Sequence, residues 1–309
     1  MARLARLRDW SMLLVCNLIW GSQFVIYKIV QRQAGPVFAP LFPIFIALLL
    51  LIPLVRAERK RRNAEFTLTH GRDILEFLLI GVFGQVVAQV FVAWSVRFTL
   101  ASNAALLALA LPIVTALMAY LFLGERMTPM RWLSFALAIA GVVEMSGIRW
   151  GQLDFTSRRY LLGNLMVLLA ISGSAFYNSY SKKLLRRYSP LEVLLYSYCV
   201  FVLAVAPIAL YTEPQTFRNM PHFTPLVWLC FFLLAVFQYF VAMVLFLNVL
   251  TRLDATQAGL SNYLITFFGV LAAVLVVHER LTPVMVIGGI LVLASTLLIT
   301  IYEQNVQSA

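Results

Sequence analysis

Ten long apolar stretches follow one another along the chain of 309 residues. Each is about 20 residues long, the length that an α-helix needs to cross a hydrocarbon layer of about 30 Å. The stretches IFIALLLLIPL and LAAVLVV lack the apolar–polar alternation that barrel strands would show. The pattern therefore predicts an all-α polytopic membrane protein with ten transmembrane helices, at roughly 11–30, 36–55, 74–95, 103–123, 130–148, 160–180, 191–211, 225–248, 257–277 and 283–302.

Composition agrees with this pattern. The chain is 62% hydrophobic and 12% charged, whereas a soluble domain carries about a quarter charged residues. The basic start followed by an apolar run resembles a signal peptide, but no small-residue cleavage site follows. The run instead continues through Trp20, Gln23 and Tyr27, so we expect an uncleaved first span.

The distribution of basic residues predicts the orientation. If the N-terminus lies inside, the inner segments hold 16 of the 24 Lys and Arg residues. Cytoplasmic loops are enriched in these residues. We therefore expect a multi-pass protein of the cell (inner or plasma) membrane with both termini in the cytoplasm. The net charge of +11 then needs no nucleic-acid partner. The run RAERKRR at 56–62 could also dock anionic lipid or a partner.

A short signature occurs twice. LGERMTP stands at 123–129 and VHERLTP at 277–283, so that their Glu-Arg-x-Thr-Pro cores lie 154 residues apart. Each half contains five predicted spans, and two successive units with an odd number of spans must enter the membrane from opposite sides. The sequence therefore predicts two inverted five-helix repeats, 1–150 and 151–309. Such repeats are typical of secondary transporters with a binding site between the repeats.

The signature itself has an architectural interpretation. Thr followed by Pro is a favourable helix start, with Thr as N-cap and Pro in the first turn. We expect Thr128-Pro129 and Thr282-Pro283 to begin the fifth and tenth spans. The functional alternative is a gate of paired charges, one on each face, built from Glu125 and Glu279 with their neighbouring arginines.

The chain resembles the drug/metabolite transporter superfamily, specifically the EamA family of ten-span transporters. The segments that carry the resemblance are NLIWGSQFV (17–25), FTLASNAALLALALPIVTALMAYLFLGERMT (98–128) and LDATQAGLSNYLITFFGVLAAVLVVHERLT (253–282). The resemblance implies a substrate cavity lined by spans 1, 3, 4, 6, 8 and 9. It also implies transport of small metabolites, often export of amino acids. The halves differ where Pro112 aligns with Thr266.

Polar residues in the spans are the candidates for substrate contact, because they are costly in lipid and usually face the bundle interior or a water-filled cavity. Gln85 and Gln89 lie four residues apart on one helical face. The alternative is that such side chains only join helices, through hydrogen bonds of about 0.6 kcal/mol each. The candidate residues are Asn17, Trp20, Phe24, Gln85, Gln89, Tyr177, Asn178, Gln238, Tyr239, Asn262, Tyr263 and Thr266.

Charge is scarce within the spans. Glu144 is the exception, which leaves proton coupling possible, although we favour an interfacial role for it. An uncharged site suits neutral, zwitterionic or aromatic compounds. We expect no enzyme, metal or cofactor, because the histidines lie in loops or at a span end and no HExxH or GxSxG motif occurs. The sequence thus predicts a transporter of small organic metabolites that acts as an exporter and works by alternating access. The alternative is a non-transporting receptor, scaffold or channel.

Overall fold

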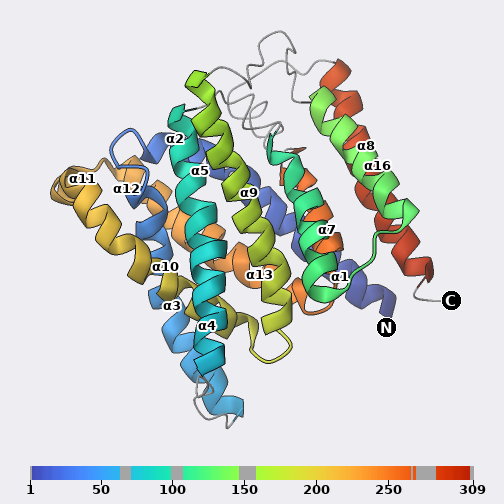
Figure 1. The fold of residues 1–309 in the computed structure, drawn as a ribbon, viewed down its shortest axis with the longest axis horizontal. Coiled ribbons are helices and arrows are strands. Elements are labelled where there is room, and N and C mark those ends of the chain that lie inside the picture. The colour runs from blue at the N-terminus through green and yellow to red at the C-terminus, as the bar shows by residue number, and fades with distance from the viewer. Residues whose placement is uncertain are drawn as a thin grey trace.

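The computed structural model describes residues 2–62, 71–98, 107–145, 158–265, 267–268 and 283–306. Within these ranges every regular element is a helix (Figure 1). Five helices are long and apolar enough to cross a membrane: Phe38–Arg62, Gly71–Ser95, Tyr160–Leu184, Pro190–Thr212 and Pro225–Leu250. They coincide with five of the predicted spans, which confirms an all-helical chain with membrane-length helices.

Helices also lie at the other five predicted positions. They are α1 (Ala2–Gly21) with α2 (Gln23–Val30), α7 (Ala110–Leu123), α8 (Pro129–Met145), α14 (Ala255–Ser261) and α16 (Pro283–Val306). Parts of these spans fall outside the described residues, so the count of ten stays a prediction. The same holds for the domain boundary near residue 150, which lies in an undescribed range.

Two of the membrane-length helices contain a π-helical segment. The first runs through α4 (Gly71–Leu79), η1 (Ile80–Val86) and α5 (Val87–Phe98); the second runs through α12 (Pro225–Leu233), η4 (Leu234–Ala242) and α13 (Met243–Leu250). The two π-helices begin 154 residues apart, which is the offset of the repeated signature. π-Helical turns are rare and occur frequently at functional sites.

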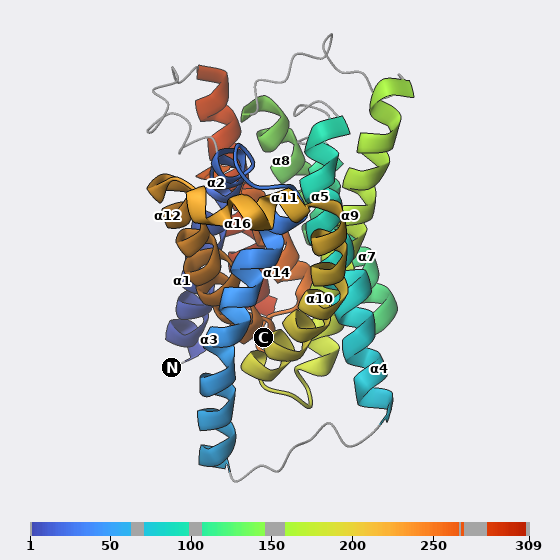
Figure 2. The same cartoon turned by 90° about the vertical axis from the view of Figure 1, so that its left-hand side faces the viewer.

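The remaining long helices are α3 (Phe38–Arg62), α9 (Arg158–Leu184) and α10 (Pro190–Thr212), and the short helices α11 (Pro214–Asn219) and η3 (Met220–His222) follow α10. Helices of the two halves pack against each other throughout, as Figures 1 and 2 show for α3 beside α10 and for α8 beside α16. The pairs between halves include α3 with α10, α5 with α9, α1 with η4, α7 with α14, and α8 with α16.

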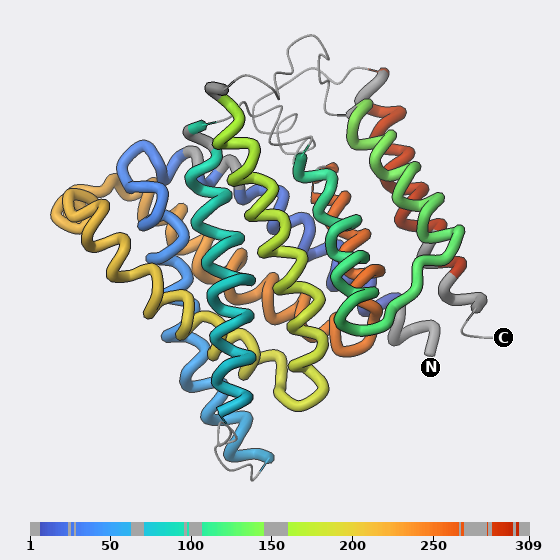
Figure 3. The backbone as a smooth tube through the Cα atoms, in the orientation of Figure 1, coloured from blue at the N-terminus to red at the C-terminus, as the bar shows by residue number. Residues whose placement is uncertain are grey.

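The first helices of the two halves, α1 and α9, run in opposite directions. In Figure 1, α1 rises from the N-terminus at the lower edge, whereas α9 begins at the upper edge and descends. The start of α1 and the end of α16 lie near the same edge (Figure 3). That edge also carries the end of α3, where Lys60 and Arg61 are exposed, and the loops that follow α7, α9 and α13. We call it the basic face.

The first copy of the repeated signature ends one helix and begins the next. Gly124 adopts a φ of 71° at the C-cap of α7, a left-handed conformation that glycine tolerates without strain. The Thr128 hydroxyl accepts a hydrogen bond from the Arg131 backbone N–H at 3.2 Å, and α8 begins at Pro129. The expected N-cap is therefore confirmed here. In the second copy Glu279 and Thr282 lie outside the described residues.

Candidate functional site

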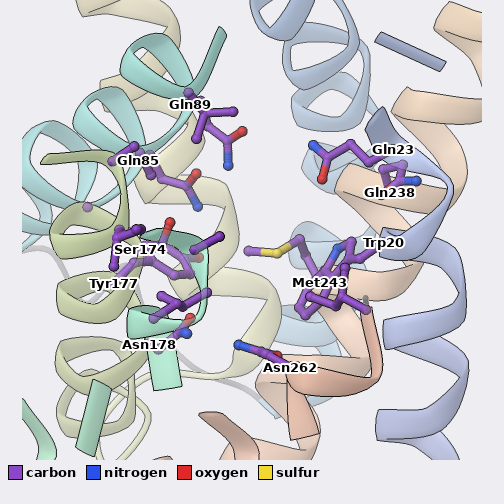
Figure 4. A pocket seen from close by; sticks show the side chains of 18 of the residues that line it. Trp20, Gln23, Gln85, Gln89, Ser174, Tyr177, Asn178, Gln238, Met243 and Asn262 are labelled. Carbon is purple, nitrogen blue, oxygen red and sulfur yellow. The ribbon is translucent and has the colours of Figure 1, made fainter. Parts of the chain in front are cut away.

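A cavity of about 250 Å³ lies between the two halves. Its lining comes from α1, α2, η1, α5, α7, α9, η4, α13 and the residues directly after α14. The volume is just below the range of about 300–1,000 Å³ for small-molecule sites. Figure 4 shows that the labelled side chains form two facing walls, with the two π-helical segments on opposite sides.

The first wall is built by η1, α5 and α9. Gln85 and Gln89 stack one above the other, and Ser174, Tyr177 and Asn178 lie below them on α9 (Figure 4). The Tyr177 hydroxyl lies 3.4 Å from Ser197 Oγ, which ties the ring to α10 behind it. This wall is therefore rich in amides and anchored from outside the cavity.

The second wall is built by α1, α2, η4, α13 and α14, and its labelled side chains are Trp20, Gln23, Gln238, Met243 and Asn262 (Figure 4). The first predicted span breaks here at Ser22, between α1 and α2. Gln238 Nε2 donates to the Ile19 carbonyl at 2.6 Å and to Ser22 Oγ at 3.2 Å. Because a carbonyl only accepts, these bonds fix the orientation of the Gln238 amide and support the break.

A chain of hydroxyls and one amide joins the two walls. The Tyr239 hydroxyl donates to Gln89 Oε1 at 3.1 Å, and the Tyr27 hydroxyl is hydrogen-bonded to the Tyr239 hydroxyl. Since the Tyr239 proton is used on Gln89, Tyr27 is the donor in the second bond. The Tyr198 hydroxyl in turn donates to the Tyr239 carbonyl at 2.8 Å. Tyr239 thus connects η4 with α2, α5 and α10.

The described charged residues that form ion pairs lie at the basic face and not around the cavity. None of the described residues that line the cavity is charged. Instead, every ion pair between described residues lies on the basic face, including Arg187–Asp73, Arg131–Asp254 and Arg252–Asp9, each at 2.7 Å between the nearest nitrogen and oxygen. Glu144 is exposed on α8 and does not line the cavity.

The structure brings most of the predicted residues together. The predicted residues that line the cavity are Trp20, Gln85, Gln89, Tyr177, Asn178, Gln238, Tyr239, Asn262 and Tyr263. The prediction for Asn17 differs from the structure: its side chain is fully buried outside the cavity and donates to Ser261 Oγ at 3.1 Å, between α1 and α14. The Phe24 side chain and residue Thr266 lie outside what the structure describes.

The lining residues that were not among the candidates include Gln23, Tyr27, Ser174 and Met243. Two signals in the sequence could have found some of them. Gly-Ser occurs just after the midpoint of both the first and the sixth predicted spans, at 21–22 and 173–174, which marks Ser174. Tyr27 continues the helical stripe of Trp20. Met243 gives no such signal, because an apolar residue in an apolar span is indistinguishable from a lipid-facing one.

A model of the EamA-like transporter family matches residues 10–147 and again residues 161–301. The chain is a member of that family. It carries two EamA domains and is a multi-pass membrane transporter of the drug/metabolite transporter group. The resemblance seen in the sequence is therefore confirmed, and EamA transporters are generally not enzymes.

Several curated relatives are similar over most of their length. An uncharacterized transporter of Archaeoglobus fulgidus is 25% identical over 292 residues, which cover 94% of this chain and 96% of the relative. A probable terminal-alkyne amino-acid exporter of Streptantibioticus cattleyicolor is 27% identical over 235 residues, 74% of each chain. A solved crystal structure with 18% identity has a TM-score of 0.78 and covers 97% of this chain and 98% of its own, which shows the shared fold.

Proposed function

We propose that this EamA transporter is a secondary transporter that exports small neutral, zwitterionic or aromatic metabolites, with amino acids as the first class to test. The main support for this proposal is a cavity of about 250 Å³ between the two halves. Its walls are formed by amide and aromatic side chains, and none of its described lining residues is charged. A similar protein named as a probable amino-acid exporter supports the substrate class.

The proposed mechanism is alternating access by two inverted five-helix repeats. Support comes from the opposite directions of α1 and α9 and from the pairing of each helix with one of the other half. The matching offset of η1 and η4 adds to it. Rocking of one repeat against the other would then open the central site to each side in turn. In this proposal the basic face is cytoplasmic, as the excess of Lys and Arg favours.

The test is flux through purified protein in liposomes, with a panel of amino acids and nucleosides, with and without a pH gradient. Gln85→Ala and Asn262→Ala should each lower flux by roughly tenfold, because each removes an amide from the cavity wall. Asn248→Ala is the matched control, since Asn248 is half-buried on α13, donates to the Val244 carbonyl at 2.7 Å and does not line the cavity. Flux that is equal in all three variants, or no flux for any compound, would contradict the proposal.

A further inference from the structure

A group of charged residues lies directly beneath the cavity on the basic face and joins the two halves. The Glu125 carboxylate, which follows α7, accepts hydrogen bonds from the backbone N–H groups of Ala255 at 2.9 Å and Thr256 at 3.0 Å. It also accepts one from the Thr256 hydroxyl at 2.8 Å. Glu125 of the first half therefore caps the start of α14 in the second half.

Two cations hold this arrangement. Lys182, near the end of α9, lies 3.4 Å from Glu125 Oε1 and 3.3 Å from Asp254 Oδ1, and it donates to the Leu253 carbonyl at 2.6 Å. Arg131 of α8 pairs with Asp254 Oδ2 at 2.7 Å. The Glu125 and Arg131 side chains are only 10% and 6% exposed, whereas the Asp254 side chain is 38% exposed, so the Lys182–Glu125 pair is the one shielded from water. We call Glu125, Lys182, Asp254 and Arg131 the latch.

The latch is close to the cavity along two helices. On α9, Asn178 lines the cavity and Lys182 belongs to the latch, one helical turn or about 6 Å further on. On α14, Thr256 contacts Glu125, and Asn262 lines the cavity six residues later, about 9 Å away. Only a short section of α7, α9 and α14 therefore separates the cavity from the basic face.

That section is polar but contains closely packed helices. Thr115 of α7 faces Gly259 of α14 so closely that a Cβ on Gly259 would lie 3.0 Å from Thr115 Cγ2. Ser179 Oγ donates to the Thr115 carbonyl at 3.1 Å, and Asn17 donates to Ser261 Oγ. We call this region between α1, α7, α9 and α14 the seam.

Three polar atoms in the seam and at its cavity end are buried without a hydrogen-bond partner among the described residues: Asn17 Oδ1, Thr115 Oγ1 and Asn262 Oδ1. Each unsatisfied buried polar group costs about 1–3 kcal/mol, so such groups call for an explanation. Such atoms also occur elsewhere, as at Ser134 Oγ of α8, but here three of them gather in one region. A passage that opens in another state of the transport cycle explains them, because water or substrate would then reach these atoms.

We infer that the seam is the closed cytoplasmic half of the substrate passage and that Glu125 is the residue that holds it closed. This inference rests on the proposed function. Glu125 connects the turn after α7 to the start of α14, and Lys182 connects both to α9. In Glu125→Gln one carboxylate oxygen becomes an NH2 group, which cannot accept a hydrogen bond. The ion pair with Lys182 and at least one of the three hydrogen bonds to α14 are then lost, so the three helices that close the seam lose part of their common contact.

Cysteine labelling tests this inference without a known substrate. In a variant without Cys16, Cys199 and Cys230, Ser261→Cys places a thiol in the seam and Ser295→Cys places one in the interface between α8 and α16. The two serines are matched, since both are fully buried and each hydroxyl donates to the carbonyl three residues earlier. A membrane-impermeant thiol reagent is then applied from the side of the basic face.

We expect Glu125→Gln to raise the labelling rate of Ser261→Cys by roughly tenfold or more, since charge-assisted hydrogen bonds are lost. The rate for Ser295→Cys should not change. An unchanged rate at Ser261→Cys in a folded Glu125→Gln variant would overturn the inference, and so would an equal rise at Ser295→Cys, which would indicate general loosening. Lys182→Met provides a second variant should Glu125→Gln fail to fold. A failed flux assay would leave these labelling rates standing, so the two proposals fail separately.

Discussion

The cavity and the latch are about one helical turn apart on α9 and yet use opposite chemistry. The cavity presents amides, hydroxyls and aromatic rings, whereas the latch is built from carboxylates, a lysine and an arginine. At membrane depth a charge costs about 2.5–3.5 kcal/mol, and an uncharged polar group costs less. The difference shows that uncharged polar side chains line the cavity deep in the protein, whereas the ion pairs lie near the membrane surface, where charge is less costly.

A charge introduced into the cavity should have the largest effect. Gln85 is 2% exposed, so Gln85→Glu places a carboxylate in a buried wall. We expect flux to fall about 100-fold at pH 8 and to recover as pH decreases, because the protonated acid is neutral. Flux as a function of pH measures this. Gln215→Glu makes the same change at an exposed residue of α11 and should leave flux unaltered. Undiminished flux of Gln85→Glu at pH 8 would contradict the role of an uncharged cavity.

Removal of a latch cation should mainly lower stability. Lys182→Met leaves the Glu125 and Asp254 carboxylates without their shared partner, and polar groups left unsatisfied in this way cost about 1–3 kcal/mol. The melting temperature should fall by several degrees. Adding Glu125→Gln should cost less than the sum of the single changes, because the two side chains interact. Lys60→Met, on the exposed end of α3, is the control. Strict additivity would show that Lys182 and Glu125 act independently.

Loss of the Arg131–Asp254 pair should have a smaller effect on the melting temperature, and this effect should depend on pH. Burial by itself raises the pKa of the Asp254 carboxyl, but the hydrogen bond from Arg131 and the charge of Lys182 outweigh it and lower the pKa below its ordinary 3.8. A depressed pKa stabilises the fold above the unfolded value and loses that contribution as pH falls through the folded value. The difference in melting temperature between wild type and Asp254→Asn should therefore stay constant from pH 8 to pH 5. It should vanish only below pH 3.8. Convergence near neutral pH would be inconsistent with this.

The smallest effect is expected within the cavity wall. Tyr239→Phe removes the hydrogen bond to Gln89 and the one from Tyr27 and keeps the ring. Each such bond between membrane helices contributes about 0.6 kcal/mol, so we expect flux to fall by about sevenfold and the melting temperature to change little. Tyr211→Phe, at a residue that is 88% exposed, is the control. A loss as large as that of Gln85→Glu would give Tyr239 a role beyond joining the walls.

Much of the fold was predictable because hydropathy reports on single helices. The amides at 85 and 89 were identified for the same reason, since polar groups stand out in apolar spans. Asn17 lies on the same helix as Trp20 but does not line the cavity and contacts α14 instead, because the sequence pattern does not tell how far along the helix the cavity extends. The latch could not be derived, because Glu125 and Thr256 are 131 residues apart and meet only through tertiary packing.

The π-helical segments at 80–86 and 234–242 also bear on how the two halves of the chain arose. A π-helical turn accommodates one residue more than an α-helical turn, so it alters which side chains the rest of that helix presents to the centre. Two independent origins at the same offset would require a coincidence of position. A single ancestral gene that already had the extra residue, and was then copied, requires none. On that account the shape of the central chamber is older than the differences between Gln89 and Met243, which occupy equivalent positions in the two halves and now give its walls unequal character.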